Sequence, residues 1–161
     1  ARVALQPGPV DLTALFRQAA ADLHSAEPGR AVVVEIEPGL VAQGDRPLLQ
    51  VLVFGLMENA WKYTASRDPG RIQVRRRVTE GREVFEVADN GIGFDMAYAG
   101  KLFEPFRRLK PDAEARGQGI GLALAKRIVQ RHGGRIWANA APERGATFHF
   151  TLRGGVSDGT V

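Results

Sequence analysis

The chain has 161 residues, of which 44% are hydrophobic and 25% are charged, as is ordinary for a globular domain with one core. It contains no cysteine, so disulfide bonds and thiolate metal sites are excluded. His24, His132 and His149 are far apart in sequence, and we expect no metal site built from histidines. The formal net charge is +4 and the isoelectric point is near 10.0. The basic residues are nevertheless spread along the chain without an aromatic strip, so we expect no nucleic-acid partner.

Hydropathy indicates no membrane segment. No run of about 18 apolar residues occurs, and residues 1–12 lack the charged-then-apolar pattern of a signal peptide. We therefore expect a cytoplasmic domain without a membrane segment of its own, although the full-length protein could be anchored through segments upstream.

The first half of the chain mixes helical and strand patterns. In chain order it predicts a helix that begins after the N-cap Asp11 and ends at Pro28, strands at 31–37 and 41–44, and a helix that begins after a second N-cap, Asp45. Residues 48–57 of the second helix are apolar almost all round. We expect this helix to be the most buried one.

The second half predicts a hairpin of strands 72–78 and 83–89, a polar segment at 95–116, a helix over 120–131, and strands at 135–139 and 146–152. Strand pairs separated by helices are typical of an α+β two-layer sandwich. We expect a mixed sheet of about five strands, covered on one face by about three helices, within one domain over 1–153. Residues 154–161 are expected to form a disordered tail.

The second helix becomes polar at its C-terminal end. Gly55, Asn59 and Lys62 fall on one helix face, where an amide and an ammonium need polar partners. A phosphate chain with a metal ion would supply them. The alternative is a solvated helix end, and this segment alone does not decide between the two.

The strand at 83–89 ends in a carboxylate. Alternation puts Asp89 on the buried face with Phe85 and Val87, and Glu86 on the opposite face, where we expect it to be solvated or at the rim. An inward carboxylate can accept a hydrogen bond from an exocyclic amine such as that of adenine, and the following Asn-Gly-Ile-Gly lets a ligand approach the backbone. The alternative, a plain turn at 89–91, is favoured when this segment is taken alone.

Glycines at 117–121 directly precede the last helix. Free amides at a helix N-terminus make an anion site when glycines let oxygen atoms approach. A dinucleotide-binding fold needs a strand just before such glycines, and 110–116 has no strand pattern, so we reject that fold.

Together these segments resemble the GHKL superfamily of ATP-binding domains, and within it the sensor histidine kinases. The matching segments are LMENAWKYT (56–64), DNGIGF (89–94), LFEPFRRL (102–109), GQGIGLALA (117–125) and GATF (145–148). The similarity covers about residues 10–152, in the family's order and spacing. Trp61 and the run at 131–138 look most like kinases linked to PAS or phytochrome sensors. The resemblance implies the family's Bergerat-type ATP-binding fold.

The resemblance also implies a role for each matching residue, with ATP and Mg²⁺ as cofactors. Asn59 and Gln118 would hold Mg²⁺, whereas Lys62 and Arg108 would contact phosphates. Asp89 would read the adenine amine. The other residues that would form the nucleotide site are Tyr63, Gly91, Gly93, Phe103, Phe106, Gly119, Gly121 and Thr147, the last of which would support Asp89 through water.

The implied activity is transfer of the γ-phosphate of ATP to a histidine on a separate dimerisation and phosphoacceptor domain, with a response-regulator receiver domain as the next partner. His24 is expected at the surface, and none of the three histidines suits the acceptor role. The alternative is an ATP-gated conformational module of the GHKL ATPase type. Gly55 argues against it, because those ATPases carry a water-activating glutamate there. We also expect a mobile lid at 101–116, between Gly100 and Gly117.

Overall fold

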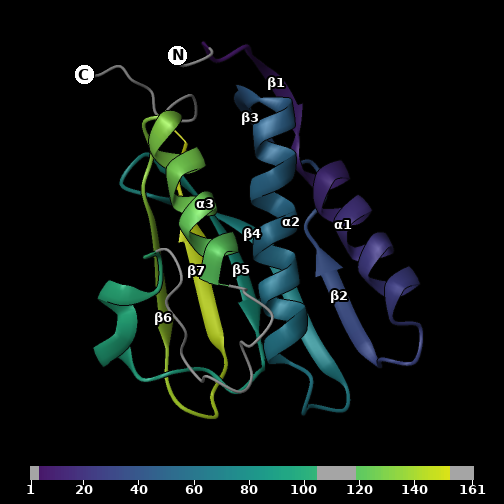
Figure 1. The fold of residues 1–161 in the computed structure, drawn as a ribbon. Helices are drawn as coiled ribbons and strands as arrows, with labels where there is room; N and C mark the ends of the chain where they lie inside the picture. Colours follow the sequence, from purple (N-terminus) through teal and green to yellow (C-terminus); the bar gives the residue numbers. More distant parts are fainter. Residues whose placement is uncertain (1–3, 105–118, 153–161) are drawn as a thin grey trace.

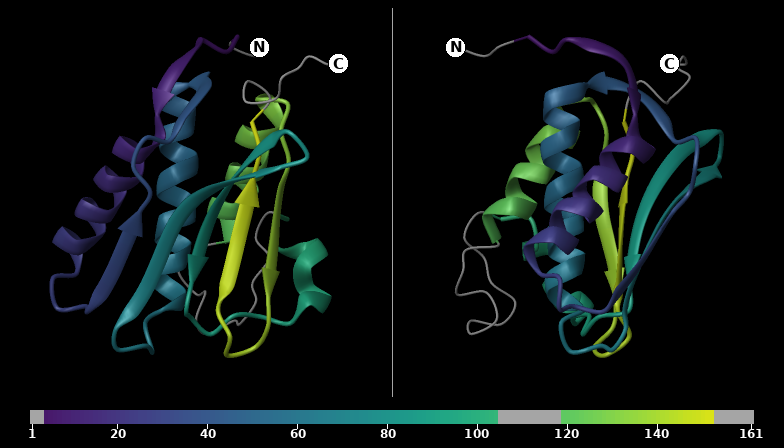
Figure 2. Two further views of the ribbon diagram at one scale, coloured as in Figure 1. Left: turned by 180° about the vertical axis from the view of Figure 1, so that it is seen from behind. Right: turned by 90° about the vertical axis from the view of Figure 1, so that its right-hand side faces the viewer.

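The computed structural model describes residues 4–104 and 119–152. Its helices are α1 (Leu12–Ala26), α2 (Arg46–Tyr63) and α3 (Gly119–Arg131), and its main strands are β2 (Val32–Ile36), β4 (Gly70–Thr79), β5 (Arg82–Asp89), β6 (Ile136–Ala140) and β7 (Ala146–Phe150). The strands form one sheet in the order β2-β4-β5-β7-β6, and the helices cover one of its faces (Figures 1 and 2). The predicted α+β two-layer sandwich is confirmed.

The sheet is mixed because β2 runs parallel to β4 while the other neighbouring strands are antiparallel. A parallel pair needs a long crossover, and α2 lies within it. The β4–β5 hairpin turns at Glu80 and Gly81, whose φ angles are 54° and 77°. Two consecutive residues with positive φ are typical of the tight turn that matches the twist of a hairpin.

A separate two-stranded ribbon lies at the N-terminal end of α2. It pairs β1 (Pro7–Asp11) with β3 (Val41–Asp45) in antiparallel register. The sequence did not predict β1, because Pro7 and Pro9 disfavour strands and are tolerated only at edges. The ribbon orders the start of α2, since the Asp45 side chain accepts hydrogen bonds from the amides of Gln6 (3.0 Å) and Leu48 (3.2 Å). These two bonds lower the pKa of Asp45.

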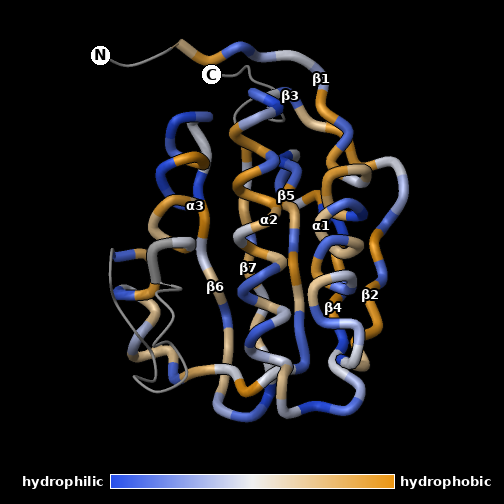
Figure 3. The backbone as a smooth tube through the Cα atoms, turned by 45° about the vertical axis from the view of Figure 1, so that its right-hand side comes forward, coloured by the Kyte–Doolittle hydropathy of each residue, from blue (hydrophilic) through white to orange (hydrophobic). Residues whose placement is uncertain are grey.

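The middle helix, α2, supplies a large share of the core, although Val51 and Phe54 on its outer face are exposed. Leu49, Leu52, Val53, Leu56 and Met57 are each at most 1% exposed. Figure 3 shows α2 changing from mostly hydrophobic to more hydrophilic toward its C-terminal end. The helix therefore anchors the fold with its first half and presents polar groups with its second. Within residues 4–104 and 119–152 we find no helix with the length and apolar character that a bilayer crossing needs.

The sheet face away from the helices carries a buried carboxylate. Glu86 is 4% exposed, so the expectation that it is solvated is wrong. Arg75 donates to it at 2.9 Å and Arg77 at 3.0 Å, and Nδ1 of His149 lies 3.2 Å away. Trp137 stacks on His149, with ring centroids 5.2 Å apart. Alternation predicted the correct face, but long side chains from the neighbouring strands cover Glu86.

The hydrogen-bond partners of Glu86 keep its carboxyl group ionised. Burial would raise the pKa of Glu86, but the hydrogen bonds from Arg75 and Arg77 outweigh it and hold that pKa below its ordinary value of 4.5. The ionised form is therefore the one that stabilises the fold.

We predict that Glu86→Gln destabilises the domain by about 1–3 kcal/mol, because two arginines lose a charged acceptor. Glu83→Gln is the matched control: Glu83 pairs with Arg76, both are partly exposed, and such pairs contribute roughly 0–1 kcal/mol. Urea unfolding at pH 7 measures both. Because the folded-state pKa is the lower one, the Glu86 effect should shrink as the pH falls below the ordinary value of 4.5. Equal losses of unfolding free energy in the two variants would contradict the stabilising role of ionised Glu86.

Candidate functional site

The polar end of α2 borders a small cavity that also touches the segment after β5, strand β7 and the first turns of α3. Its lining residues are Asn59, Tyr63, Gly93, Phe94, Leu122, Ala146 and Phe148. Three predicted site residues, Asn59, Tyr63 and Gly93, thus meet at one place. Its volume is about 10 Å³, so an aromatic base enters only if the surrounding side chains move apart. The sequence named no role for Phe94 or Leu122, whose apolar character indicated only core.

The segment after β5 is wedged between α2 and the β6–β7 turn. The amide of Ile92 donates to the carbonyl of Tyr63, the last residue of α2, at 3.1 Å. A Cβ on Gly91 would overlap that same carbonyl oxygen, and a Cβ on Gly93, whose φ is +63°, would overlap the carbonyl of Ala141. Backbone packing by itself therefore requires glycine at both positions.

Asp89 stands at the edge of this wedge. It lies across from Ile72 and Ala146 in the sheet register, both on the helix-covered face. Burial raises the pKa of Asp89 to about 6, although hydrogen bonds from the amides of Gly91 (2.8 Å) and Ala146 oppose the shift. An ionised carboxylate held by only two amides can still accept a hydrogen bond from an amine.

The predicted support of Asp89 by Thr147 does not fit the structure. Thr147 pairs with Ala88, which lies on the opposite sheet face from Asp89. Burial along β7 alternates, with Ala146 and Phe148 buried on the inner side and Thr147 partly exposed. The residue across from Asp89 is Ala146, which offers only its backbone amide.

The groups predicted to bind phosphate lie around α2 and the start of α3. Asn59 is 6% exposed, and the Lys62 ammonium lies 5.8 Å from the centroid of the Tyr63 ring. The N-terminal residues of α3 include Gly119 and Gly121, and a Cβ on Gly55 would be in ordinary contact with the Gly121 carbonyl at 3.6 Å. Position 55 is therefore where α3 passes over α2.

The start of the predicted lid is partly described. Residues Met96–Lys101 form a short 3₁₀ helix, η1, that begins after the N-cap Asp95. Leu102 is buried, and Phe103 packs edge-on against Phe148 with ring centroids 6.1 Å apart. Phe106, Arg108 and Gln118, with most of the lid, lie outside the described residues.

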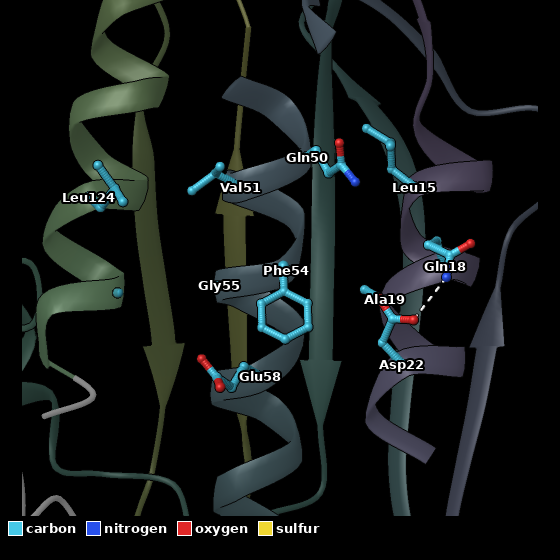
Figure 4. Close-up of a pocket in the computed structure, with 11 residues that line it drawn as sticks. Leu15, Gln18, Ala19, Asp22, Gln50, Val51, Phe54, Gly55, Glu58 and Leu124 are labelled. Atoms are coloured by element: carbon cyan, nitrogen blue, oxygen red, sulfur yellow. Dashed lines mark hydrogen bonds between the residues drawn. The ribbon is translucent and has the colours of Figure 1, made fainter. Parts of the chain in front are cut away.

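A larger cavity of about 440 Å³ lies over α2, between α1 and α3 (Figure 4). Val51, Phe54 and Leu124 are partly exposed in it, at 46%, 36% and 43%. Gly55 and Gly121 also line it, so it adjoins the predicted phosphate end without containing Asn59 or Asp89. The larger of these two cavities is therefore not the one that the predicted adenine and magnesium residues line.

One site contact had no signal in the sequence. Arg67, in the turn after α2, donates hydrogen bonds to the carbonyls of Asn90 and Gly91 behind the small cavity. A lone arginine in a polar turn is ordinarily a solvated surface residue, and its long-range partners appear only in the folded chain.

The family model described as histidine kinase-, DNA gyrase B- and HSP90-like ATPase matches residues 44–155. The chain belongs to this family. It is 36% identical over 108 residues to the adaptive-response sensory kinase SasA of Rippkaea orientalis, covering 67% of this chain and 27% of that protein. It is 37% identical over 127 residues to cyanobacterial phytochrome A of Nostoc sp., covering 79% of this chain and 16% of that protein.

Solved structures agree with this family assignment. Full-length ShkA in complex with AMPPNP is 27% identical, with a TM-score of 0.75 over 100% of this chain and 34% of that one. The predicted resemblance to sensor histidine kinases, including phytochrome-linked ones, is confirmed. The chain spans about a quarter or less of the two curated relatives, so the activity of a whole kinase remains a proposal for it.

We predict that Asp89→Asn stabilises the nucleotide-free domain at pH 7. The folded-state pKa of about 6 lies above the ordinary value of 3.8, so ionisation of the buried carboxyl costs stability as the pH rises from 3.8 to 6. The variant should gain on the order of 2 kcal/mol at pH 7 and almost nothing near pH 4. Thermal unfolding at several pH values measures the difference from wild type. For the control Glu35→Gln, at an exposed residue, the stability difference from wild type should not change with pH. A pH-independent difference for Asp89→Asn would contradict the prediction.

Proposed function

We propose that this domain binds ATP with Mg²⁺ and provides the γ-phosphate for transfer to a histidine on a separate domain of the same kinase, in two-component signalling. The observation that carries the proposal is that the segment after β5 connects a partly buried carboxylate, Asp89, to the polar end of α2: Ile92 donates to the Tyr63 carbonyl, and Gly93 lines one small cavity with Asn59 and Tyr63. Membership of a family that includes histidine kinases supports it.

The adenine end is formed by Asp89 and the Gly91–Gly93 backbone. The exocyclic amine of adenine is a donor, and an ionised Asp89 is an acceptor-only group. Tyr63, Phe94 and Phe148 supply apolar surface for the flat faces of the base. An amine-bearing base would give Asp89 a hydrogen-bond donor in addition to the amides of Gly91 and Ala146.

The phosphate end is formed by α2 and α3. Lys62 would contact phosphate as a point charge, and the first amides of α3, around Gly119 and Gly121, would bind phosphate oxygens at the positive end of the helix dipole. Arg108, which lies outside the described residues, would add a second cation.

The residues present fit a magnesium ion held through the nucleotide. Among the described residues no group of three or more His, Cys, Asp or Glu side chains could hold a metal. Mg²⁺ is commonly bound by one or two protein ligands together with phosphate oxygens and waters. Asn59 would supply one such ligand and Gln118 another, while Gly55 supplies none. The bound ion would neutralise the charge of the phosphates.

The phosphate acceptor must come from another segment, since the histidines here are engaged elsewhere. His132 is buried, and its Nε2 accepts a hydrogen bond from the backbone amide of Asp45 at 3.0 Å. His149 contacts Glu86, and both nitrogens of His24 lie within 3.1 Å of backbone carbonyls. His24 is thus half-buried rather than free at the surface. A dimerisation and phosphoacceptor domain and a receiver domain are the proposed partners, in the cytoplasm.

No observation favours the ATP-gated module. Gly55 carries no carboxyl to activate water, and Glu58 lines the larger cavity over α2 rather than the small cavity.

We predict that Asp89→Asn weakens ADP binding roughly tenfold or more, because an amide nitrogen then faces the adenine amine at a cost of about 1–3 kcal/mol. Glu35→Gln should bind within about twofold of wild type. In wild type, affinity should fall as the pH drops below about 6, where Asp89 takes up a proton. Isothermal titration calorimetry measures all three. Equal affinities of Asp89→Asn and wild type would remove Asp89 as the adenine acceptor.

We predict that the isolated chain binds nucleotide but does not label itself with the γ-phosphate of radiolabelled ATP, because its histidines are occupied by the contacts above. Label should appear when the helical segment that precedes the family domain in the same kinase is added in trans, and only on that segment. Stable label on His24, His132 or His149 would contradict the proposal.

A further inference from the structure

We infer that Arg67 is a positioning residue for adenine recognition: it holds two backbone segments behind Asp89 so that the carboxyl stays aimed at the base. The inference rests on the proposed ATP binding and adds a residue that the family motifs do not include. Arg67 lies between α2 and β4, outside every matched segment of the sequence.

The contacts of Arg67 are to backbone carbonyls of two separate segments. Its Nε donates to Asn90 at 2.8 Å, and its Nη2 donates to Gly91 at 3.1 Å and to Glu143, in the β6–β7 turn, at 3.3 Å. The planar guanidinium presents its donors in a fixed fork, which sets the spacing of the carbonyls it joins. The side chain is 29% exposed, so water competes only in part.

The two segments that Arg67 joins are the ones that hold Asp89. The amide of Gly91 donates to Asp89 Oδ1 at 2.8 Å, while the carbonyl of Gly91 accepts from Arg67. On the other side, a Cβ on Gly145 would overlap the Asp89 carbonyl, so the β6–β7 turn packs directly on the Asp89 backbone. The amide of Glu143 donates to the Ile92 carbonyl at 2.6 Å. A shift of either segment therefore moves Asp89.

The carbonyl contacts, rather than the ion pair, carry this role. Arg67 also contacts the Glu143 carboxylate at 3.0 Å, but that side chain is 67% exposed. Exposed ion pairs contribute little, whereas partly buried carbonyls that lose a charged donor are costly to leave unpaired. Removing the Glu143 carboxylate should thus leave the site intact, and removing Arg67 should not.

An arginine that only stabilises the fold would make the same contacts. The experiment must therefore report on recognition of the nucleobase. ADP and IDP differ at the position where adenine carries its amine and hypoxanthine carries a carbonyl oxygen. A well-aimed Asp89 accepts from the amine and repels the oxygen. Discrimination between the two nucleotides therefore reports the aim of Asp89, and a loss of global stability alone would not change it in a protein that is still folded.

The experiment measures dissociation constants for ADP and IDP by calorimetry in wild type, Arg67→Ala, Arg67→Lys, Glu143→Gln and Arg76→Ala. The last removes an arginine that pairs with Glu83 on the distant hairpin. We expect Arg67→Ala to weaken ADP binding about tenfold with little change for IDP. The ADP affinity of Arg67→Lys should lie between those of wild type and Arg67→Ala, because an ammonium cannot reproduce the forked donors of the guanidinium. Glu143→Gln and Arg76→Ala should keep the wild-type ratio.

An unchanged ADP-to-IDP preference in folded Arg67→Ala would overturn the inference and leave the proposed function standing. Wild type that binds neither nucleotide would overturn both. If Arg67→Ala does not fold, hydrogen exchange of Arg67→Lys decides: we expect faster exchange of the Gly91 and Ile92 amides with α1 unchanged, and unchanged protection at both amides would overturn the inference.

Discussion

The site depends on one constraint, the close backbone contact of the segment after β5 with the end of α2. Gly91 lies against the Tyr63 carbonyl and Gly93 against that of Ala141, and neither place has room for a Cβ. The contact joins a helix from the core to the segment that follows β5, so Asn59 and Tyr63 of α2 line one cavity with Gly93 and Phe94. A larger side chain at either glycine would separate the two halves of the site.

Two carboxylates on β5, the buried Glu86 and the partly buried Asp89, have pKa values shifted in opposite directions. Glu86 is surrounded by two arginines and a histidine, which lower its pKa, and it contributes to folding. Within residues 4–104 and 119–152 the partners of Asp89 are the backbone amides of Gly91 and Ala146, and burial raises the pKa of Asp89 to about 6. The fold therefore tolerates an incompletely satisfied charge at Asp89. Such a charge costs stability in the empty protein and favours a ligand that brings a hydrogen-bond donor.

Helix α2 links the stability of the fold to the chemistry of the site. Its first half buries one face in the core, and its last turns carry Asn59, Lys62 and Tyr63. Because the same rigid element forms core and site, the polar groups are placed without a flexible support. The larger cavity over its outer face reaches the proposed phosphate end at Gly55 and Gly121. A molecule bound in that cavity would therefore contact the helices that are proposed to hold the phosphates.

The sequence by itself determined what depends on near neighbours. The N-caps Asp11 and Asp45, the helical and strand periods and the layered order were all predictable, because each follows from residues a few positions apart. Only the tertiary structure decided the burial of Glu86, the outward placement of Thr147 and the bonds of Arg67. Each of these depends on residues brought from distant parts of the chain to adjacent strands or turns, and no local pattern encodes which long side chain will cover, or reach, a given group.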